Sequence, residues 1–477
     1  MPTNPEEYRF VLAGEQHSGE AYDLCCPYDQ QLIARVHRAS AADLQQAIQA
    51  AVDAFAITRR IPAHKRATVL RNIADSIHAQ SEDLARTIAL EAGKPIKQAR
   101  IEVGRSAVTF AAAADEASRS HDEALRLDAA PGGEGRQGVL RRFPIGPIAA
   151  ISPFNFPLNL VAHKLAPAIA AGCPVVLKPA SQTPITALKL AAIIGESGWP
   201  KQALSVLPMN SREAAPLVED PRFKMLTFTG SPAVGWGMKG RAGSKRVTLE
   251  LGGNAGVIIH SDANLDFAAA RSTIGGFSYA GQTCISVQRI FVHERVYEDF
   301  MDRFVAAVQK LKLGHPLDEA SDLSALISKS EGERIQEWLQ EAYAAGAETI
   351  LGGKVQDGIV EPTILVKAGP QLRVNCQEIF APVVTVQSYN DFNQALEELN
   401  SSDFGLQAGL FTQDVGRIFA AYDKLDVGGL IINDVPTWRV DPMPYGGVKQ
   451  SGFGREGLKY AIEEMTEPKL LVINLQS

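Results

Sequence analysis

Residues 148–178 read IAAISPFNFPLNLVAHKLAPAIAAGCPVVLK, and this stretch decides the fold. An apolar run at 148–151 is followed by a helix-length segment from about 158 to 171, and a second apolar run occupies 175–177. Short apolar runs that alternate with helices are typical of parallel strands covered on both faces. The stretch therefore predicts one β-α-β unit.

The same texture continues outward along the chain. Further strand candidates lie at 204–207, 225–228 and 247–251, with helix-length segments between them. Thr183-Pro184 predicts an N-cap followed by proline at the first position of the intervening helix. Five such strands predict a doubly wound α/β domain, which binds ligands at the carboxyl ends of its strands.

The first third of the chain is predicted to be helical. Ser40 and Asp43 form a capping pair before a periodic apolar pattern, and apolar residues recur at helical spacing over 70–88, which predicts a second helix. A third helix is predicted from about 97 to 117. We expect these helices to cover the sheet of the first domain.

A second α/β series is predicted from about residue 255, with an amphipathic helix over 297–311, and it ends near the glycine-rich stretch 446–457. Two strand-like segments, 123–142 and 469–475, fit neither domain. A chain of 477 residues is too long for one hydrophobic core, so two or three domains are expected.

Composition excludes several classes of protein. The formal net charge is −7, which gives no basic footprint for nucleic acid. The sequence shows no signal peptide and no apolar run long enough to span a membrane. Its five cysteines are scattered and form no CxxC pair, which predicts reduced thiols, a cytoplasmic location and no metal site.

The strongest local signal is GQTCIS at 281–286. Small residues around Cys284 allow a substrate to approach the backbone closely, which makes this cysteine a candidate nucleophile. A free cysteine is also often a small buried apolar residue, and that alternative stays open on the residue alone.

Six motifs, in order, give the chain its resemblance to a known family. They are PFNFP at 153–157, KPA at 178–180, FTGS at 228–231, LELGG at 249–253, GQTC at 281–284 and QEIFAP at 377–382. The set resembles the aldehyde dehydrogenase superfamily from about residue 20 to the C-terminus. Residues 154–164 look most like the lactaldehyde and phosphonoacetaldehyde dehydrogenase subgroup.

The resemblance implies an aldehyde dehydrogenase-like fold of two doubly wound α/β domains and a small β oligomerisation arm. The implied division is a dinucleotide-binding domain of 1–118 and 143–251, a catalytic domain of 252–448, and an arm of 119–142 and 449–477. It also implies a homodimer or homotetramer.

The resemblance assigns three catalytic residues. Cys284 would attack the aldehyde carbon as a thiolate, and Asn155, with the Cys284 backbone N–H, would stabilise the resulting oxyanion. Glu250 would activate water to hydrolyse the thioester. Members that pass the acyl group to coenzyme A typically lack this glutamate, so its presence favours a free acid product.

The implied cofactor is NADP or NAD. The residues that would bind it are Ser152, Lys178, Ser181, Gly230, Ser231, Gly235, Glu378 and Phe380. Ser181 stands where many NAD-preferring relatives carry glutamate, so a 2′-phosphate would not be repelled. Pro208-Met209 replaces the Pro-Gly of the family, which leaves the adenine pocket less defined.

Asn159, His163 and Arg439 are predicted to form a small polar substrate pocket. Relatives that act on apolar aldehydes often carry tryptophan in place of His163, so a small polar aldehyde, lactaldehyde-like or a semialdehyde, is expected. Alternatively, His163 is satisfied within its own helix and Arg439 pairs with Asp441. The alternative functions are a succinic semialdehyde dehydrogenase, a non-redox cysteine hydrolase and a non-catalytic scaffold.

Overall fold

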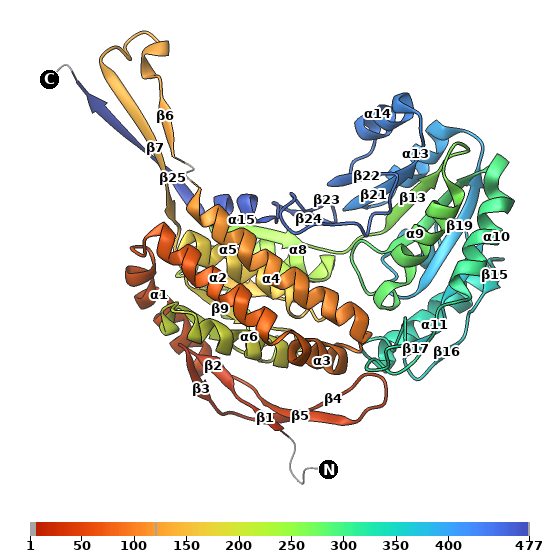
Figure 1. The fold of residues 1–477 in the computed structure, drawn as a ribbon, viewed down its shortest axis with the longest axis horizontal. Coiled ribbons are helices and arrows are strands. Elements are labelled where there is room, and N and C mark those ends of the chain that lie inside the picture. The colour runs from red at the N-terminus through yellow and green to blue at the C-terminus, as the bar shows by residue number, and fades with distance from the viewer. Residues whose placement is uncertain (1–5, 120–121, 476–477) are drawn as a thin grey trace.

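Two mostly parallel sheets, each covered by helices on both faces, form the body of the chain, and a three-stranded β arm projects from it (Figure 1). The structure is a computed structural model that describes residues 6–119 and 122–475. The prediction of two doubly wound α/β domains with a small β arm is confirmed.

The first sheet has eight strands in the order β24-β12-β11-β8-β9-β10-β2-β3. Its strands are β8 (Ile148–Ile151), β9 (Val175–Lys178), β10 (Leu204–Val206), β11 (Met225–Thr229), β12 (Arg246–Glu250), β2 (Phe10–Leu12), β3 (Glu15–His17) and β24 (Gly452–Phe453). The five central strands are parallel and match the predicted apolar runs. Strand order reverses between β8 and β11, and the crevice at such a switch point is where doubly wound sheets bind ligands.

Eight helices belong to the first domain. They are α1 (Ala41–Thr58), α2 (Ala63–Ala79), α3 (Ser81–Ala92), α4 (Ile96–Ser118), α5 (Asn159–Ala171), α6 (Ile185–Glu196), α7 (Ala215–Glu219) and α8 (Pro232–Arg241). Ser40 and Asp43 form the predicted capping box before α1.

Two local predictions are wrong. The single helix expected over 70–88 is broken at Gln80 into α2 and α3, and both bury their apolar residues in the same core, which is why the periodicity continues. Helix α6 begins at Ile185 rather than Pro184, and Thr183 does not cap it. The buried carboxylate of Glu91 caps it instead, because it accepts from the backbone N–H groups of Ile185 and Thr186 at 2.8 and 3.0 Å.

The second sheet has seven strands in the order β15-β18-β19-β14-β13-β21-β22. They are β13 (Ala255–Ile259), β14 (Val287–His293), β15 (Glu348–Leu351), β18 (Thr363–Val366), β19 (Val383–Tyr389), β21 (Gln407–Phe411) and β22 (Gly429–Ile432), and only β15 is antiparallel. The helices around it are α9 (Leu265–Phe277), α10 (Tyr297–Val308), α11 (Lys329–Ala344), α12 (Arg373–Cys376), α13 (Phe392–Asn400) and α14 (Val415–Lys424).

The arm consists of β6 (Glu123–Leu125), β7 (Arg136–Pro144) and β25 (Thr466–Asn474), with β7 in the centre. The antiparallel register of β25 and β7 runs from Thr466 opposite Pro144 to Asn474 opposite Arg136. The other C-terminal elements, β24 and α15 (Leu458–Glu464), pack against the first domain. The segment 449–477 is therefore divided between body and arm; residues 120–121 and 476–477 of the predicted arm lie outside the described residues.

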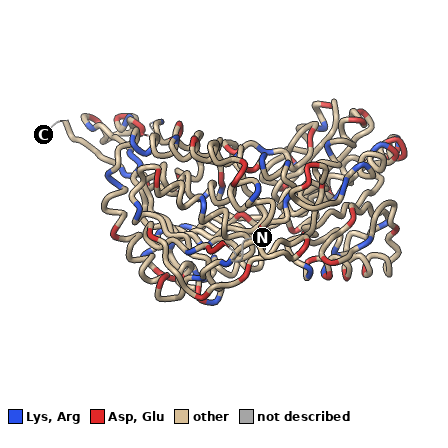
Figure 2. Tube along the Cα trace, turned by 60° about the horizontal axis from the view of Figure 1, so that its bottom comes forward, with Lys and Arg blue, Asp and Glu red and all other residues tan. Residues whose placement is uncertain are grey.

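Short strands complete the chain. They are β1 (Glu6–Tyr8), β4 (Ala21–Cys25), β5 (Leu32–His37), β16 (Val355–Gln356), β17 (Ile359–Val360), β20 (Phe404–Gly405) and β23 (Val448–Lys449). Basic and acidic residues are interspersed along the trace (Figure 2). Within the described part of the chain, no helix combines the length and the apolar character needed to cross a bilayer.

Candidate active site

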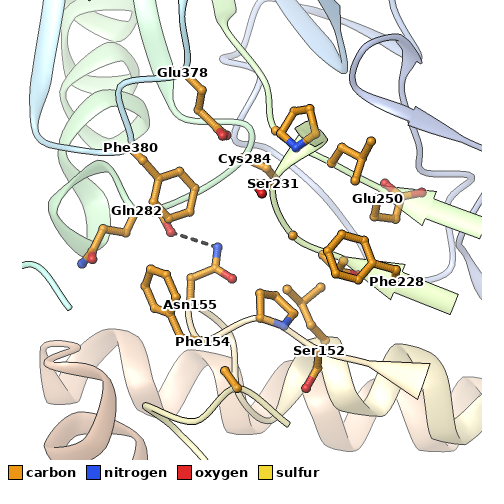
Figure 3. Close-up of a pocket in the computed structure, with 18 of the residues that line it drawn as sticks. Ser152, Phe154, Asn155, Phe228, Ser231, Glu250, Gln282, Cys284, Glu378 and Phe380 are labelled. Atoms are coloured by element: carbon orange, nitrogen blue, oxygen red, sulfur yellow. Dashed lines mark hydrogen bonds between the residues drawn. The ribbon is translucent and has the colours of Figure 1, made fainter. Parts of the chain in front are cut away.

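A cavity of about 600 Å³ lies where the carboxyl ends of β8, β11 and β12 face the loops of the second sheet (Figure 3). Eight predicted site residues line it, namely Ser152, Asn155, Gly230, Ser231, Glu250, Cys284, Glu378 and Phe380. The structure thus brings together residues that are up to 228 positions apart. The other six, Lys178, Ser181, Gly235, Asn159, His163 and Arg439, do not belong to this lining.

A tight backbone turn presents Cys284 to the cavity. Tyr279, Ala280 and Gly281 have φ values of 50°, 51° and 70°, all in the left-handed region. A Cβ at position 281 would lie 2.2 Å from the carbonyl oxygen of Ala381, so only glycine fits there. Strained backbone of this kind is often found at functional sites.

The Cys284 thiol is partly exposed to the cavity, and its Sγ lies 3.0 Å from the hydroxyl of Tyr445. Burial raises the pKa of the thiol, while the Tyr445 hydrogen bond and the charge of Arg439 act to lower it. The neighbouring carboxyl groups of Glu378 and Glu250 raise it further. The thiolate therefore depends on specific donors and cations around it.

Asn155 follows β8 and faces the same cavity. Its side-chain Nδ2 donates to the carbonyl oxygen of Gln282 at 3.0 Å, and its Oδ1 is buried without a partner among the described residues (Figure 3). Gln282 lies two residues before Cys284, so this hydrogen bond holds the Asn155 amide close to the nucleophile. The amide is therefore suited to donate to an oxyanion that forms on the substrate.

A buried ion pair that sequence reasoning missed supports this loop. Lys94 donates to the carboxylate of Glu102 and, at 2.7 Å, to the backbone oxygen of Asn155. The other carboxylate oxygen of Glu102 accepts from the backbone N–H groups of Leu158 and Asn159 at the start of α5. The pair therefore fixes the backbone that carries Asn155.

Glu250 ends β12 inside the cavity. It is 3% exposed, and neither carboxylate oxygen has a hydrogen-bond partner among the described residues. Burial, followed by the nearby charge of Glu456, raises its pKa well above the ordinary carboxyl value. Gly446 makes room for it, since a Cβ there would lie 2.9 Å from Oε1. A buried, unpartnered carboxyl group with a raised pKa is suited to general base chemistry.

Glu456 and Lys164, which sequence reasoning also missed, lie behind Glu250. The buried Lys164 Nζ donates to Thr229 Oγ1 at 2.7 Å and to Glu456 Oε1 at 3.3 Å. Burial opposes ionisation of Glu456, but the charges of Lys164, His163 and Arg439 together lower the pKa of that carboxyl. The negative charge of Glu456 therefore favours the protonated form of Glu250.

The cofactor residues at the first sheet retain free hydrogen-bonding capacity. Ser152 Oγ is buried without a partner among the described residues, and Lys178 Nζ contacts only the neighbouring Pro179 carbonyl, at 3.3 Å. Burial lowers the pKa of Lys178. The hydroxyl of Tyr22 donates to the backbone oxygen of Ser181 at 3.0 Å, which fixes the loop after β9.

Two glycines let the start of α8 pack closely against the side chains of Phe228 and Leu251. A Cβ at Gly230 would lie 2.5 Å from the Phe228 ring, and one at Gly235 would lie 2.4 Å from Leu251. Ser231 is the N-cap residue and its side chain makes no capping bond. Free N–H groups at a helix start suit a pyrophosphate.

Glu378 and Phe380 approach from the second sheet (Figure 3). Glu378 accepts from the backbone N–H of Gly253 at 2.9 Å, and burial raises its pKa to about 7. The Phe380 ring packs edge-on against Phe154 at 5.9 Å. The unsatisfied Ser152 and Lys178, the open α8 terminus and this carboxylate fit a dinucleotide that lies across both domains.

The structure gives the predicted substrate residues Asn159 and His163 a partner within the protein. Both are buried in α5, and both bind Asp441, from Asn159 Nδ2 at 3.1 Å and from His163 Nε2 at 2.9 Å. His163 is therefore bound by a residue outside its own helix, which contradicts the alternative that the helix itself satisfies it. The ion pair recorded for Asp441 is with Arg105, at 2.7 Å, whereas the carboxylate recorded next to Arg439 is Glu456.

Arg439 packs against Tyr445, whose hydroxyl contacts the Cys284 sulfur. Its guanidinium stacks 3.6 Å above the Tyr445 ring, and its Nη2 lies 3.8 Å from Glu456 Oε2. The side chain is 6% exposed, and Nε has no acceptor among the described residues. Nη2 also lies 3.4 Å from His163 Nε2, so Nε is the guanidinium N–H that remains available to an anionic ligand group.

One possible metal cluster lies outside the cavity. Cys26, Asp29 and His315 offer ligand atoms within 4.8 Å of one another, although they are far apart in sequence. His315 Nδ1 accepts from the backbone N–H of Leu317, so in the neutral ring Nε2 carries the proton and faces Asp29 at 3.4 Å. The recorded contact between these two side chains is an imidazole–carboxylate contact.

Comparison with known proteins agrees with this geometry. Residues 14–471 match the aldehyde dehydrogenase family. The chain is 44% identical to 3-sulfolactaldehyde dehydrogenase of Priestia aryabhattai, over 99% of both chains. Among solved structures, aldehyde dehydrogenase 21 from Physcomitrella patens in complex with succinate has a TM-score of 0.97 and 44% identity over 99% of both chains.

A third relative bears on the cofactor. Glyceraldehyde-3-phosphate dehydrogenase from Methanocaldococcus jannaschii, complexed with NADP, has a TM-score of 0.91 and 38% identity over 95% of this chain and 98% of that chain. Together with the cavity and its lining, these matches show that the chain belongs to the aldehyde dehydrogenase family and is an NAD(P)-dependent aldehyde dehydrogenase.

Proposed function

We propose that this enzyme oxidises a short aldehyde that carries an anionic or hydroxyl group to its free carboxylic acid. The observation that carries the proposal is the buried Arg439 guanidinium, whose Nε lacks an acceptor among the described residues and whose neighbour Tyr445 touches the Cys284 sulfur. A buried cation with a free donor is stabilised by an anion in the substrate.

In the proposed mechanism, the Cys284 thiolate forms a C–S bond with the aldehyde carbon, and the carbonyl π electrons move to the oxygen. The Asn155 amide donates to this oxyanion in exchange for the Gln282 carbonyl that it binds at rest. When bound, the nicotinamide supplies the acceptor for the aldehyde hydride. Cys284 then holds the acyl group as a thioester.

Glu250 completes the cycle by removing a proton from water that attacks the thioester. Its two unpartnered oxygens are free to accept that proton. Ser152, Lys178, Ser231 and Glu378 would hold the cofactor, because each offers a free polar atom or a carboxylate at the cavity wall or behind it.

The activities for which the relatives are named support a small polar substrate. One is a 3-sulfolactaldehyde dehydrogenase, another, from Methanococcus aeolicus, is a lactaldehyde dehydrogenase, and the moss enzyme is in complex with succinate as the reaction product. A sulfonate, a hydroxyl and a carboxylate share the capacity to accept from a guanidinium. Arg105, 28% exposed at its side chain and paired with Asp441, is a second cation near this end of the site.

The substrate proposal predicts a charge-dependent selectivity. Arg439→Met should reduce kcat/KM for succinic semialdehyde by about tenfold to a hundredfold, the size of a lost hydrogen bond to a charged group. Butanal, which has no anion, should lose much less. The measurement is kcat/KM for both aldehydes in the parent and the variant, with Arg439→Lys as the charge-retaining control. Equal losses for both aldehydes would show that Arg439 serves only the structure.

We also propose that the enzyme self-associates through its arm. The arm exposes Phe143, Leu470, Leu471, Val472, Ile473 and Leu475, which are between 38% and 61% exposed. Strand β25 lies at the edge of its sheet, so its free edge and apolar side chains suit a second copy of the chain. Light scattering should give the mass of a dimer or tetramer, and Leu471→Lys should shift it toward the monomer. A monomeric parent at micromolar concentration would refute the proposal.

A further inference from the structure

Tyr445 contacts the reacting atom of the enzyme, although sequence reasoning gave it no role. Its hydroxyl lies 3.0 Å from the Cys284 Sγ, and the residue is 4% exposed. The two residues are 161 positions apart in the chain. Among the described residues, the phenol is the side chain that the structure records in a hydrogen bond with this sulfur.

The surroundings of Tyr445 hold it in place. Its backbone pairs in both directions with Glu456, through N–H donors at 3.0 and 2.6 Å. Its ring packs with Ile285 and Leu406 in a small apolar cluster that includes Cys284 at its edge. The Arg439 guanidinium covers the ring at 3.6 Å. The hydroxyl is therefore fixed relative to the sulfur rather than free to rotate away.

The direction of the hydrogen bond follows from the chemistry of the two groups. A thiolate has no proton, so once Cys284 ionises only the phenol can donate. Burial, and next the neighbouring Cys284, raise the pKa of Tyr445 well above its usual value, so the phenol keeps its proton. The Arg439 cation over the ring draws electron density from the hydroxyl and makes it a better donor.

We propose that Tyr445 is a further catalytic residue, whose hydroxyl donates a hydrogen bond to the Cys284 thiolate and stabilises the ionised nucleophile. This inference rests on the proposed role of Cys284. The thiol proton leaves to solvent base, and Tyr445 keeps its own proton throughout. When the C–S bond forms, the sulfur loses its charge and the hydrogen bond to it weakens.

The expected size of the effect has two opposing parts. A hydrogen bond to a charged acceptor lowers the pKa by about one to two units, which raises the thiolate fraction about tenfold to a hundredfold. The stabilised thiolate is also less nucleophilic, by about threefold for each unit. The net gain at neutral pH is therefore about threefold to tenfold.

Other charged groups face the sulfur and act in both the parent and a Tyr445 variant. Glu378 and Glu250 raise the pKa of Cys284, and Arg439 lowers it. They come from three separate segments, and none is removed when the phenol loses its oxygen. A change in the pH profile of Tyr445→Phe therefore reports on the hydroxyl.

The test is the rate of Cys284 alkylation by iodoacetamide in Tyr445→Phe and the parent, from neutral to strongly alkaline pH. At neutral pH the variant should react about threefold to tenfold more slowly. At the alkaline plateau it should react faster than the parent, because its thiolate is more nucleophilic. The plots of alkylation rate against pH for the variant and the parent should therefore cross. A substitution that only loosened the packing around Cys284 would not produce such a crossing.

Tyr389→Phe is the matched control. Tyr389 is a buried phenol of the second sheet that lies outside the cavity lining, and its hydroxyl lies 2.8 Å from His260 Nδ1. Loss of this hydroxyl should leave the midpoint of the profile unchanged. An unshifted midpoint in Tyr445→Phe, or slower alkylation at every pH, would overturn the inference. If Cys284→Ala kept full aldehyde dehydrogenase activity, the proposed function itself would fail. That outcome is distinguishable from an unshifted midpoint in Tyr445→Phe, which would overturn only the role of Tyr445.

Discussion

Cys284→Ala should reduce aldehyde oxidation to below about 1% of the parent, an increase of about 3 kcal/mol or more in the activation barrier. Among the described residues that line the cavity, Cys284 carries the only thiol, the group that forms the thioester intermediate. The variant should still bind NADP or NAD, since the free polar atoms of Ser152 and Lys178 are untouched. Steady-state turnover and a fluorescence titration of cofactor measure the two effects separately.

Cys376→Ala is the control for this substitution. Cys376 is also a partly exposed free thiol, but it lies on α12 outside the cavity lining. It should retain parental turnover. Residual oxidation by Cys284→Ala well above 1%, with the control unchanged, would rule out a cysteine-linked mechanism.

Glu250→Gln should separate the two halves of the reaction. The amide cannot take a proton from water, so thioester hydrolysis should slow about a hundredfold or more while the first acylation proceeds. Rapid mixing should record a burst of NAD(P)H close to one per active site, followed by slow turnover. A burst that falls together with the steady state would show that Glu250 is not specifically the hydrolytic base.

The pH dependence provides a second reading of Glu250. Its folded-state pKa lies well above the ordinary value because of burial and Glu456, and a base acts only when deprotonated. Parental hydrolysis should therefore increase as pH rises through this raised pKa, and the glutamine variant should lose that rise. Glu196→Gln, at an exposed position at the end of α6, should keep both burst and pH profile.

The sequence alone predicted the elements whose signals are local. Apolar runs such as 148–151 and 225–228 became central strands because a strand covered on both faces must be apolar throughout. The capping box at Ser40 formed because its two partners are three residues apart. The motif around Cys284 predicted a candidate nucleophile, and the structure places it at the cavity.

Errors arose where the partner of a polar group lies far along the chain. The alternative that His163 is satisfied within its own helix is wrong, because Asp441, 278 residues away, binds it. Thr183 was expected to cap α6, but Glu91 fills that role. A buried polar group must be satisfied, and residue type alone does not reveal which distant group satisfies it.

The tertiary structure alone decided what surrounds the nucleophile. Tyr445, Lys94 and Glu456 carry no motif that marks them as neighbours of Cys284, Asn155 and Glu250. They meet because two sheets close over one cavity and bring their loops together. Local sequence determines periodicity and backbone conformation, whereas the pairing of buried charges and donors is set by the packing of whole domains, where an unpaired group costs about 1–3 kcal/mol.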